Sequence, residues 1–127
     1  MAQGEIAHID FPADDPERAM RFYGAVAGWE FGEMPDMPGY HLFSTREGQG
    51  GAIGLRGKTI GTALRIYISV DSLEVACAAA EANGGTVVEQ PTDIGGGWGR
   101  FAVVRDPEGS EVGLFEAAAQ PAAQPEG

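Results

Sequence analysis

Hydrophobic and polar residues alternate along the first half of the chain in a pattern that predicts a strand, a helix and three more strands. The segment EIAHIDFPA alternates and ends beside a proline, which is typical of a strand. DDPERAMRFYGAVAG follows, with aspartates and a proline at its start, a glycine at its end and apolar residues at helical spacing. Glycine and proline turns then separate three short strands. The expected elements are a strand at 5–13, a helix at 14–28, and strands at 29–34, 39–46 and 51–57.

The same order of elements begins again at Thr62. An alternating, β-branched strand precedes an alanine-rich helix that starts at Ser72 and ends at Asn83. GWEFGE in the first half matches GGTVVE in the second, and GYHLFSTR matches GWGRFAVVR. The chain is therefore predicted to hold two copies of a βαβββ module, the second with a strand at 62–71, a helix at 72–85, and strands at 86–94, 97–106 and 110–117.

The length of the chain supports one domain. With 127 residues and 43% hydrophobic content, the chain is long enough for one domain with a hydrophobic core and too short for two ordinary domains. The last residues, AAAQPAAQPEG, have no apolar period and cannot offset their ordering entropy. We expect a single domain at 1–117, with modules at about 5–57 and 62–116, and a flexible tail at 118–127.

Acidic residues outnumber basic ones by 19 to 8, which gives a formal net charge of −11 at pH 7. This balance repels phosphate backbones and anionic lipid, so we expect neither a nucleic acid nor a membrane partner. No window approaches the roughly 20 apolar residues of a membrane span, and the opening MAQGEIAHID lacks the features of a signal peptide. Cys77 is the single cysteine and cannot form an internal disulfide. A cytoplasmic protein is expected.

Three stretches of the chain resemble the vicinal oxygen chelate superfamily, which includes glyoxalases, bleomycin resistance proteins and extradiol dioxygenases. HIDFPADDPERAMRFYGAVAGWEF resembles its opening strand and helix, YISVDSLEVACAAAEANGGTVVEQP its second strand and helix, and GRFAVVRDPEGSEVGLFE its closing hairpin. The resemblance covers about residues 5–116. It implies an α+β fold in which two tandem βαβββ modules form a curled mixed eight-strand sheet around a cavity, with the helices outside. It also implies a homodimer, but the fold alone does not choose among the family's chemistries.

Metal-using members of this superfamily draw their ligands from four inward-facing strand positions. Here those positions hold His8, Gly54, Arg65 and Gly113. Glycine has no donor atom, and arginine stays cationic and opposes a divalent ion. Because zinc and other divalent ions need several protein ligands, we expect no metal and no other cofactor.

His8 and Asp10 form the candidate catalytic pair. If His8 faces the cavity, strand alternation turns Asp10 to the same side. An imidazole beside a carboxylate can act as a general acid or base. The alternative is a hydrogen-bonded histidine that only orients a ligand or a water molecule. Gly54 and Gly113, which lack side chains, are expected to leave room for a ligand on the cavity floor.

Arg65, Tyr67, Trp98 and Arg100 are the candidate ligand-binding residues. Alternation on the fifth strand turns Arg65 and Tyr67 inward, and on the seventh strand it puts Trp98 and Arg100 on one face near the cavity mouth. The rings offer stacking area, and Arg65 can hold an anionic group with two hydrogen bonds. The alternatives are an internal ion pair for Arg65 and a dimer contact for Trp98.

Three classes of function stay open, the third being an accessory domain that works through a partner by its edge strands or the Trp98 loop. The leading hypothesis is metal-independent binding of a small aromatic or anionic molecule in the sheet cavity, because the metal ligands are missing while an aromatic and polar lining is kept. The alternative is an isomerase or lyase that uses His8 and Asp10 for proton transfer on a carbonyl substrate. A metal-dependent lyase or dioxygenase fits these residues less well.

Overall fold

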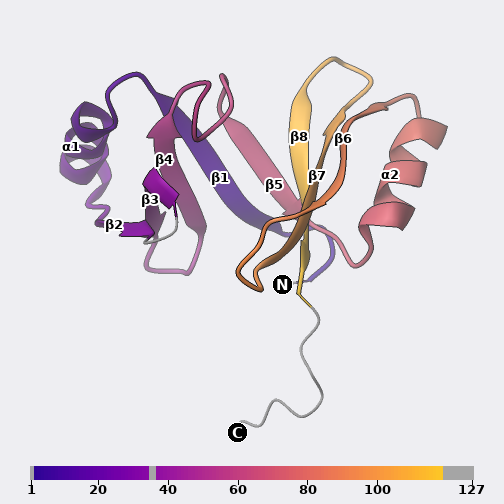
Figure 1. Ribbon diagram of the computed structural model, residues 1–127, viewed down its shortest axis with the longest axis horizontal. Coiled ribbons are helices and arrows are strands. Elements are labelled where there is room, and N and C mark those ends of the chain that lie inside the picture. Colours follow the sequence, from indigo (N-terminus) through magenta and orange to yellow (C-terminus); the bar gives the residue numbers. More distant parts are fainter. Residues whose placement is uncertain (1, 35–36, 119–127) are drawn as a thin grey trace, which may run out of the picture. The chain divides into compact units, whose positions relative to one another are not determined.

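The computed structural model describes residues 2–34 and 37–118, and the chain divides into two compact units. The first unit comprises Ile6–Tyr67, and the second comprises the chain from Ile68 onward together with the residues before Ile6. Within the described residues the chain forms two helices and eight strands (Figure 1). The tail expected at 118–127 lies outside the described residues, apart from Ala118.

The first unit contains one helix and a sheet of four complete strands. The strands are hydrogen-bonded in the order β2-β3-β4-β1, in which β1 and β4 are parallel and the other pairs are antiparallel. The elements are β1 (Ile6–Ala13), α1 (Pro16–Ala27), β2 (Phe31–Met34), β3 (Met37–Ser44) and β4 (Gly50–Leu55).

The ends of α1 lie where the sequence predicts them. The side chain of Asp15 caps the helix by accepting a hydrogen bond from the backbone N–H of Arg18 at 3.1 Å. Pro16 occupies the first turn, where its missing N–H costs no helical hydrogen bond. Gly28 ends the helix in the left-handed conformation, with φ of 76°.

The second unit repeats this order. Its sheet has the order β5-β8-β7-β6, which matches β1-β4-β3-β2 of the first unit position by position. The α+β class and the two tandem βαβββ modules are therefore confirmed. No helix among the described residues is long and apolar enough to cross a membrane. The elements are β5 (Arg65–Ser69), which spans the boundary between the units, α2 (Leu73–Ala82), β6 (Thr86–Asp93), β7 (Gly99–Arg105) and β8 (Glu111–Ala117).

Each unit has an apolar core of its own. In the first unit, Trp29 stacks on Phe43 with ring centroids 4.0 Å apart, and Phe11 meets both rings edge-on. In the second unit, α2 packs on the sheet through a cluster of small and aliphatic side chains, namely Val70, Leu73, Cys77, Ala102, Val104 and Leu114. In the first unit, residues of β1 and β3 that alternate with the aromatic ones point to the opposite face, and this face carries the candidate site.

Candidate functional site

Strand register brings three polar side chains to one face of the first unit. His8 and Asp10 are two residues apart on β1, so both point to the same side. Tyr40 on β3 pairs with Gly54 on β4, which in turn pairs with Pro12 on β1. Because directly opposite residues share a face of the sheet, Tyr40 lies on the same side as His8 and Asp10.

The strand β4, which lies between β3 and β1, allows the side chain of Tyr40 to extend over it to β1. On this face β4 carries only Gly50, Ala52 and Gly54, which pair with β1 at His8, Asp10 and Pro12. None of the three has a side chain larger than a methyl group. The ring of Tyr40 can therefore extend over β4 and bring its hydroxyl to the side chains of β1.

His8, Asp10 and Tyr40 form a closed triangle of hydrogen-bonding atoms. Nε2 of His8 lies 2.8 Å from Oδ1 of Asp10 and 2.9 Å from the hydroxyl oxygen of Tyr40, and this hydroxyl donates to the same Oδ1 at 3.0 Å. The side chain of Asp10 is 9% exposed, whereas that of His8 is 26% exposed. The ring of Tyr67 meets the imidazole edge-on, with centroids 5.8 Å apart. We name His8, Asp10, Tyr40 and Tyr67 the His8 cluster.

Both tyrosines of the His8 cluster stay protonated at neutral pH. Burial raises the pKa of Tyr40 far above its usual value, and the negative charge of Asp10 and the hydrogen bond to it raise this pKa further. Burial also raises the pKa of Tyr67, and Asp10 adds to the effect, whereas the hydrogen-bonded guanidinium of Arg65 opposes it. The two phenols are therefore hydrogen-bond donors in this site and not bases.

The structure brings four of the predicted site residues together. His8, Asp10, Arg65 and Tyr67 are linked through hydrogen bonds and a ring contact within the first unit. Sequence reasoning missed Tyr40, which closes the triangle. The signal that could have found it is the run of small residues on β4, because such a run lets a long side chain from the next strand cross to β1.

The residues present do not fit a divalent metal ion. Of the four ligand positions implied by the family resemblance, two are glycines and one is Arg65. Nε2 of His8 is already within hydrogen-bond distance of Asp10 and Tyr40. Within the described residues, no group of three or more His, Cys, Asp or Glu side chains lies close enough to hold a metal. We therefore derive no metal chemistry for this site.

The expected open space at Gly54 is a wrong prediction. A Cβ atom built on Gly54 would lie 2.6 Å from Oγ1 of Thr59 and 2.9 Å from Cδ1 of Ile60. The chain that follows β4 folds back and fills the space beside this glycine. The absence of a side chain at Gly54 thus allows Thr59 and Ile60 to pack closely against it, and no room is left for a ligand at this position.

Arg100 lies on a different face from the one expected. It shares with Ala102 the face of β7 that packs against α2. Its guanidinium donates to Glu74 of α2 through two hydrogen bonds of 2.9 Å and to Glu116 of β8 at 2.7 Å. Glu116 also accepts from the backbone N–H of Leu73, at the start of α2. Arg100 therefore fastens α2 to the sheet of the second unit.

Trp98 lies in the loop before β7 and not on the strand. The strand begins at Gly99, whose φ of 128° breaks the alternation on which the expected shared face of Trp98 and Arg100 depended. The indole is 55% exposed, and it lies against Gly96. The shared strand face is therefore a wrong prediction, while the ligand-binding role of Trp98 stays a prediction.

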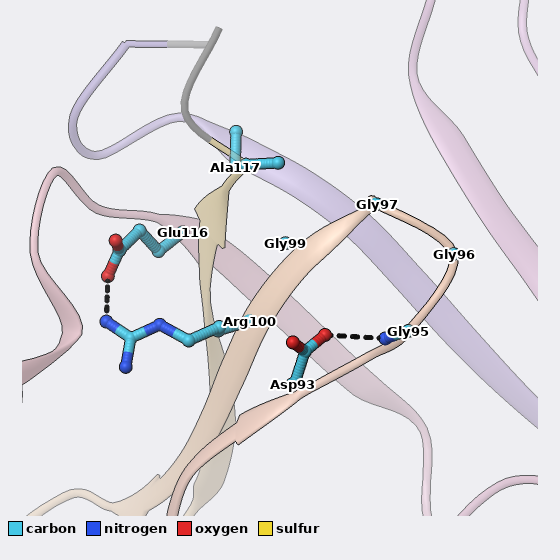
Figure 2. Close-up of a pocket in the computed structure, with 9 residues that line it drawn as sticks. Asp93, Gly95, Gly96, Gly97, Gly99, Arg100, Glu116 and Ala117 are labelled. Carbon is cyan, nitrogen blue, oxygen red and sulfur yellow. Dashed lines mark hydrogen bonds and ion pairs between the residues drawn. The ribbon is translucent and has the colours of Figure 1, made fainter. Parts of the chain in front are cut away.

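A hollow of about 320 Å³ lies beside this loop in the second unit (Figure 2). Asp93, Arg100 and Glu116 are register partners on β6, β7 and β8, so they form one polar row along it. Figure 2 shows the carboxylate of Glu116 turned to Arg100 and that of Asp93 turned to the backbone N–H of Gly95. The charge of Arg100 is thus balanced inside the protein. The hollow is lined by Asp93, Gly95, Gly96, Gly97, Gly99, Arg100, Glu116, Ala117 and Ala118.

Comparison with known proteins places this chain in a family. The family model described as "Glyoxalase-like domain" matches residues 7–115. A Vibrio parahaemolyticus protein named "Probable lactoylglutathione lyase" is 30% identical over 128 residues, which cover 91% of this chain and 93% of that protein. "Putative glyoxylase CFP32" of Mycobacterium tuberculosis is 32% identical over 120 residues, or 92% of this chain. The chain spans only 46% of the length of that relative.

A solved structure shows the same fold at low sequence identity. Methylmalonyl-CoA epimerase from Mycobacterium tuberculosis superposes with a TM-score of 0.63 and 18% identity, covering 97% of this chain and 96% of that one. This likeness supports the fold alone. The match of the family model over nearly all described residues goes further, and the chain belongs to the glyoxalase-like domain family of the vicinal oxygen chelate superfamily.

Proposed function

We propose that the protein binds a small molecule with an aromatic or anionic group, without a metal, at the His8 cluster and Arg65. The observation that carries this proposal is the gathering of two phenol donors, an imidazole and a guanidinium in one partly buried group of side chains. Binding sites for small molecules combine apolar and aromatic surface with a few converging polar groups. The misfit of the same residues to a divalent ion supports the metal-independent form of the proposal.

Arg65 supplies the anion recognition in this proposal. Its guanidinium hydrogen-bonds to the hydroxyl of Tyr67. A guanidinium carries a fixed positive charge and has five N–H donors in a planar fork. A carboxylate or carbonyl group of a ligand can take two of these donors while Tyr67 offers ring surface. We also propose Trp98 and Arg100, in the second unit, as ligand-binding residues.

Benzoate, a flat aromatic anion, is a suitable probe. We expect it to shift the amide NMR signals of β1 and β5 in protein treated with chelator. Arg65→Gln should weaken its affinity about tenfold or more, since hydrogen bonds to charged groups contribute about 1.5–3 kcal/mol. Arg46→Gln, at an exposed position in the turn after β3, is the matched control. Benzoate binding that requires added nickel, zinc, manganese or iron would overturn the proposal, as would equal affinity for the Arg65→Gln variant.

The second candidate function is proton transfer on a carbonyl compound, as in an isomerase or a lyase. The distance of 2.8 Å between His8 and Asp10 favours it, because a carboxylate at this distance orients an imidazole and stabilises its protonated form. The name of a similar protein, a probable lactoylglutathione lyase, belongs to one of these reaction classes. If proton transfer is the function, His8→Gln should abolish turnover and leave ligand affinity within a few fold. Equal loss of both would favour binding alone.

Assembly and location belong to the same proposal. We propose a cytoplasmic homodimer that has neither a nucleic acid nor a membrane partner. The formal net charge of −11 supports the last two points, since it opposes binding to phosphate-rich surfaces. Light scattering on the purified chain tests the assembly, and a monomer at all concentrations would contradict it.

A further inference from the structure

The hydrogen-bond triangle fixes which nitrogen of His8 carries a proton. A carboxylate oxygen only accepts hydrogen bonds, and Oδ1 of Asp10 lies 2.8 Å from Nε2 of His8 and 3.0 Å from the hydroxyl of Tyr40. The hydroxyl has a single hydrogen, which it donates to Asp10. Nε2 must therefore carry a hydrogen of its own, because it would otherwise bring a lone pair against the carboxylate. The neutral imidazole is then the Nε2–H tautomer.

This tautomer leaves Nδ1 of His8 with a lone pair. Between residues 2 and 118, leaving aside 35–36, no hydrogen bond to Nδ1 is found. The side chain is 26% exposed, so a small molecule can reach the ring. The ring is held from two sides, because Tyr40 lies parallel to it with centroids 6.3 Å apart and Tyr67 meets it edge-on. Nε2 is therefore engaged by Asp10 and Tyr40, whereas no contact among the described residues occupies Nδ1.

Tyr40 fixes the position of the Asp10 carboxylate, and this carboxylate in turn fixes the orientation of the His8 imidazole. Its hydroxyl donates to the same oxygen of Asp10 that accepts from His8, so this oxygen has two donors that fix its position. The phenol itself cannot take up a proton, and burial next to Asp10 keeps it in its neutral form. Its role is therefore that of a positioning residue, which acts on the ligand only through His8 and Asp10.

We infer that Nδ1 of His8 is the atom that receives a proton or a hydrogen bond from the ligand, and that Tyr40 is the positioning residue that fixes this arrangement through Asp10. The inference rests on the proposed function for its ligand. It adds that the ligand presents an acidic hydrogen to the imidazole, as a carbonyl compound with a C–H bond next to the carbonyl group does. Benzoate has no such hydrogen and therefore probes the contact with Arg65 alone.

The proton-transfer step balances without another reactant. The C–H bond breaks, the proton forms an N–H bond at Nδ1, and the electron pair moves to the carbonyl oxygen as an enolate. Asp10 stabilises the imidazolium that results, and the positive charge of the Arg65 guanidinium, in the same group of side chains, favours the enolate. Return of the proton to the same or a neighbouring carbon completes an epimerisation or an isomerisation.

Nitrogen NMR of the imidazole rings tests the inference without any ligand. The chain has two histidines, and His41 pairs with Ile53 on the opposite face of the sheet, so it serves as the internal comparison. For neutral His8 we expect the shift of a protonated Nε2 and an unprotonated Nδ1, with a slowly exchanging Nε2 hydrogen. A protonated Nδ1, or a mixture of tautomers like that of a free imidazole, would overturn the assignment.

The role of Tyr40 has its own test. In Tyr40→Phe the Nε2 hydrogen of His8 should exchange with solvent about tenfold faster, because a hydrogen bond that fixes Oδ1 of Asp10 is lost. Tyr23→Phe, in the aromatic cluster on the other face, is the control and should leave this rate unchanged. An unchanged rate in a folded Tyr40→Phe variant would refute the positioning role. The failure of benzoate to bind would refute the proposed function and leave the tautomer measurement intact, so the two failures are distinguishable.

Discussion

Gly54 and Thr59 compete for the same space. A Cβ atom on Gly54 would lie 2.6 Å from Oγ1 of Thr59. This hydroxyl accepts from the backbone N–H of Leu55 at 2.8 Å and donates to the carbonyl of Gly39 at 3.2 Å, so it is held in place from both sides. The strand position at which the family resemblance implies a metal ligand can therefore take a side chain only if Thr59 and Ile60 shift. The misfit to a metal follows from the packing as well as from the missing ligand atom.

Replacement of Gly54 should be costly even with the smallest side chain. We expect Gly54→Ala to lower the free energy of unfolding by about 1–3 kcal/mol, because the methyl group overpacks the space filled by Thr59 and Ile60. Gly32→Ala on β2 is the control, since its new methyl group would meet nothing within 4 Å. Urea unfolding of both variants measures the difference. Equal stability of the two variants would show that Thr59 moves aside at no cost.

Patterns among neighbouring residues were enough to predict the helices and strands, whereas the candidate site depends on contacts between strands that are far apart in the sequence. Capping by Asp15 and the left-handed Gly28 are readable in the sequence because each involves neighbours along the chain. The contact of Tyr40 with His8 depends on a register across three strands and on the small residues of β4 between them. No period in the sequence reports such a contact. His8 and Asp10 were predicted correctly to lie together because a single strand carries both.

Two errors come from the limits of strand alternation as a guide to side-chain direction. Alternation predicts faces only while the backbone stays extended, and it fails at Gly99, where φ is 128°. Trp98 was therefore placed on a strand that begins after it. Alternation also does not indicate which face of a sheet a helix covers. Arg100 was therefore expected on the face away from α2, whereas it lies on the face toward α2 and hydrogen-bonds to Glu74 of that helix. The glycines of the loop signalled irregular backbone, but not its direction.

Tyr40 should lower the alkaline stability of the protein. Its pKa in the folded state lies above its usual value of 10.0, so the folded state holds the phenolic proton more tightly than the unfolded chain. The resulting stabilisation is complete below the unfolded-state pKa and is lost as the pH rises above it. We expect the free energy of unfolding to fall less steeply above about pH 10 in Tyr40→Phe than in the wild type. Urea unfolding across this pH range measures it, with Tyr23→Phe as the comparison. Parallel profiles for all three proteins would contradict the expectation.

Glu74 should contribute to stability only above acidic pH. The hydrogen bond from Arg100 lowers the pKa of Glu74 below its usual value of 4.5. The folded state thus binds this proton more weakly than the unfolded chain, so the contribution is present above the usual value and is lost as the pH falls through the lowered one. At low salt, Glu74→Gln should lower the melting temperature at neutral pH, and this effect should shrink as the pH falls below 4.5 and through the lowered pKa of Glu74.

Glu81→Gln provides the matched control for Glu74. Glu81 lies on the same helix and makes no ion pair with any described residue. Its replacement should change the melting temperature little at either pH. Because Glu74 is exposed, added salt should reduce the effect of Glu74→Gln. An effect that persists unchanged at high salt or at acidic pH would mean that Glu74 acts through packing and not through the charge of Arg100.

The two tryptophans should differ in their contribution to stability and in the quenching of their fluorescence. Trp29 stacks on Phe43 at 4.0 Å, whereas Trp98 is 55% exposed in its loop. We expect Trp29→Phe to destabilise the protein by roughly 1–2 kcal/mol and Trp98→Phe to change stability by less than about 0.5 kcal/mol. Since the chain has two tryptophans, each variant isolates the other, and acrylamide should quench Trp98 far more strongly than Trp29. A shielded Trp98 would mean that another chain or a bound molecule covers the loop, and a change of its quenching on addition of benzoate would place this loop at the ligand.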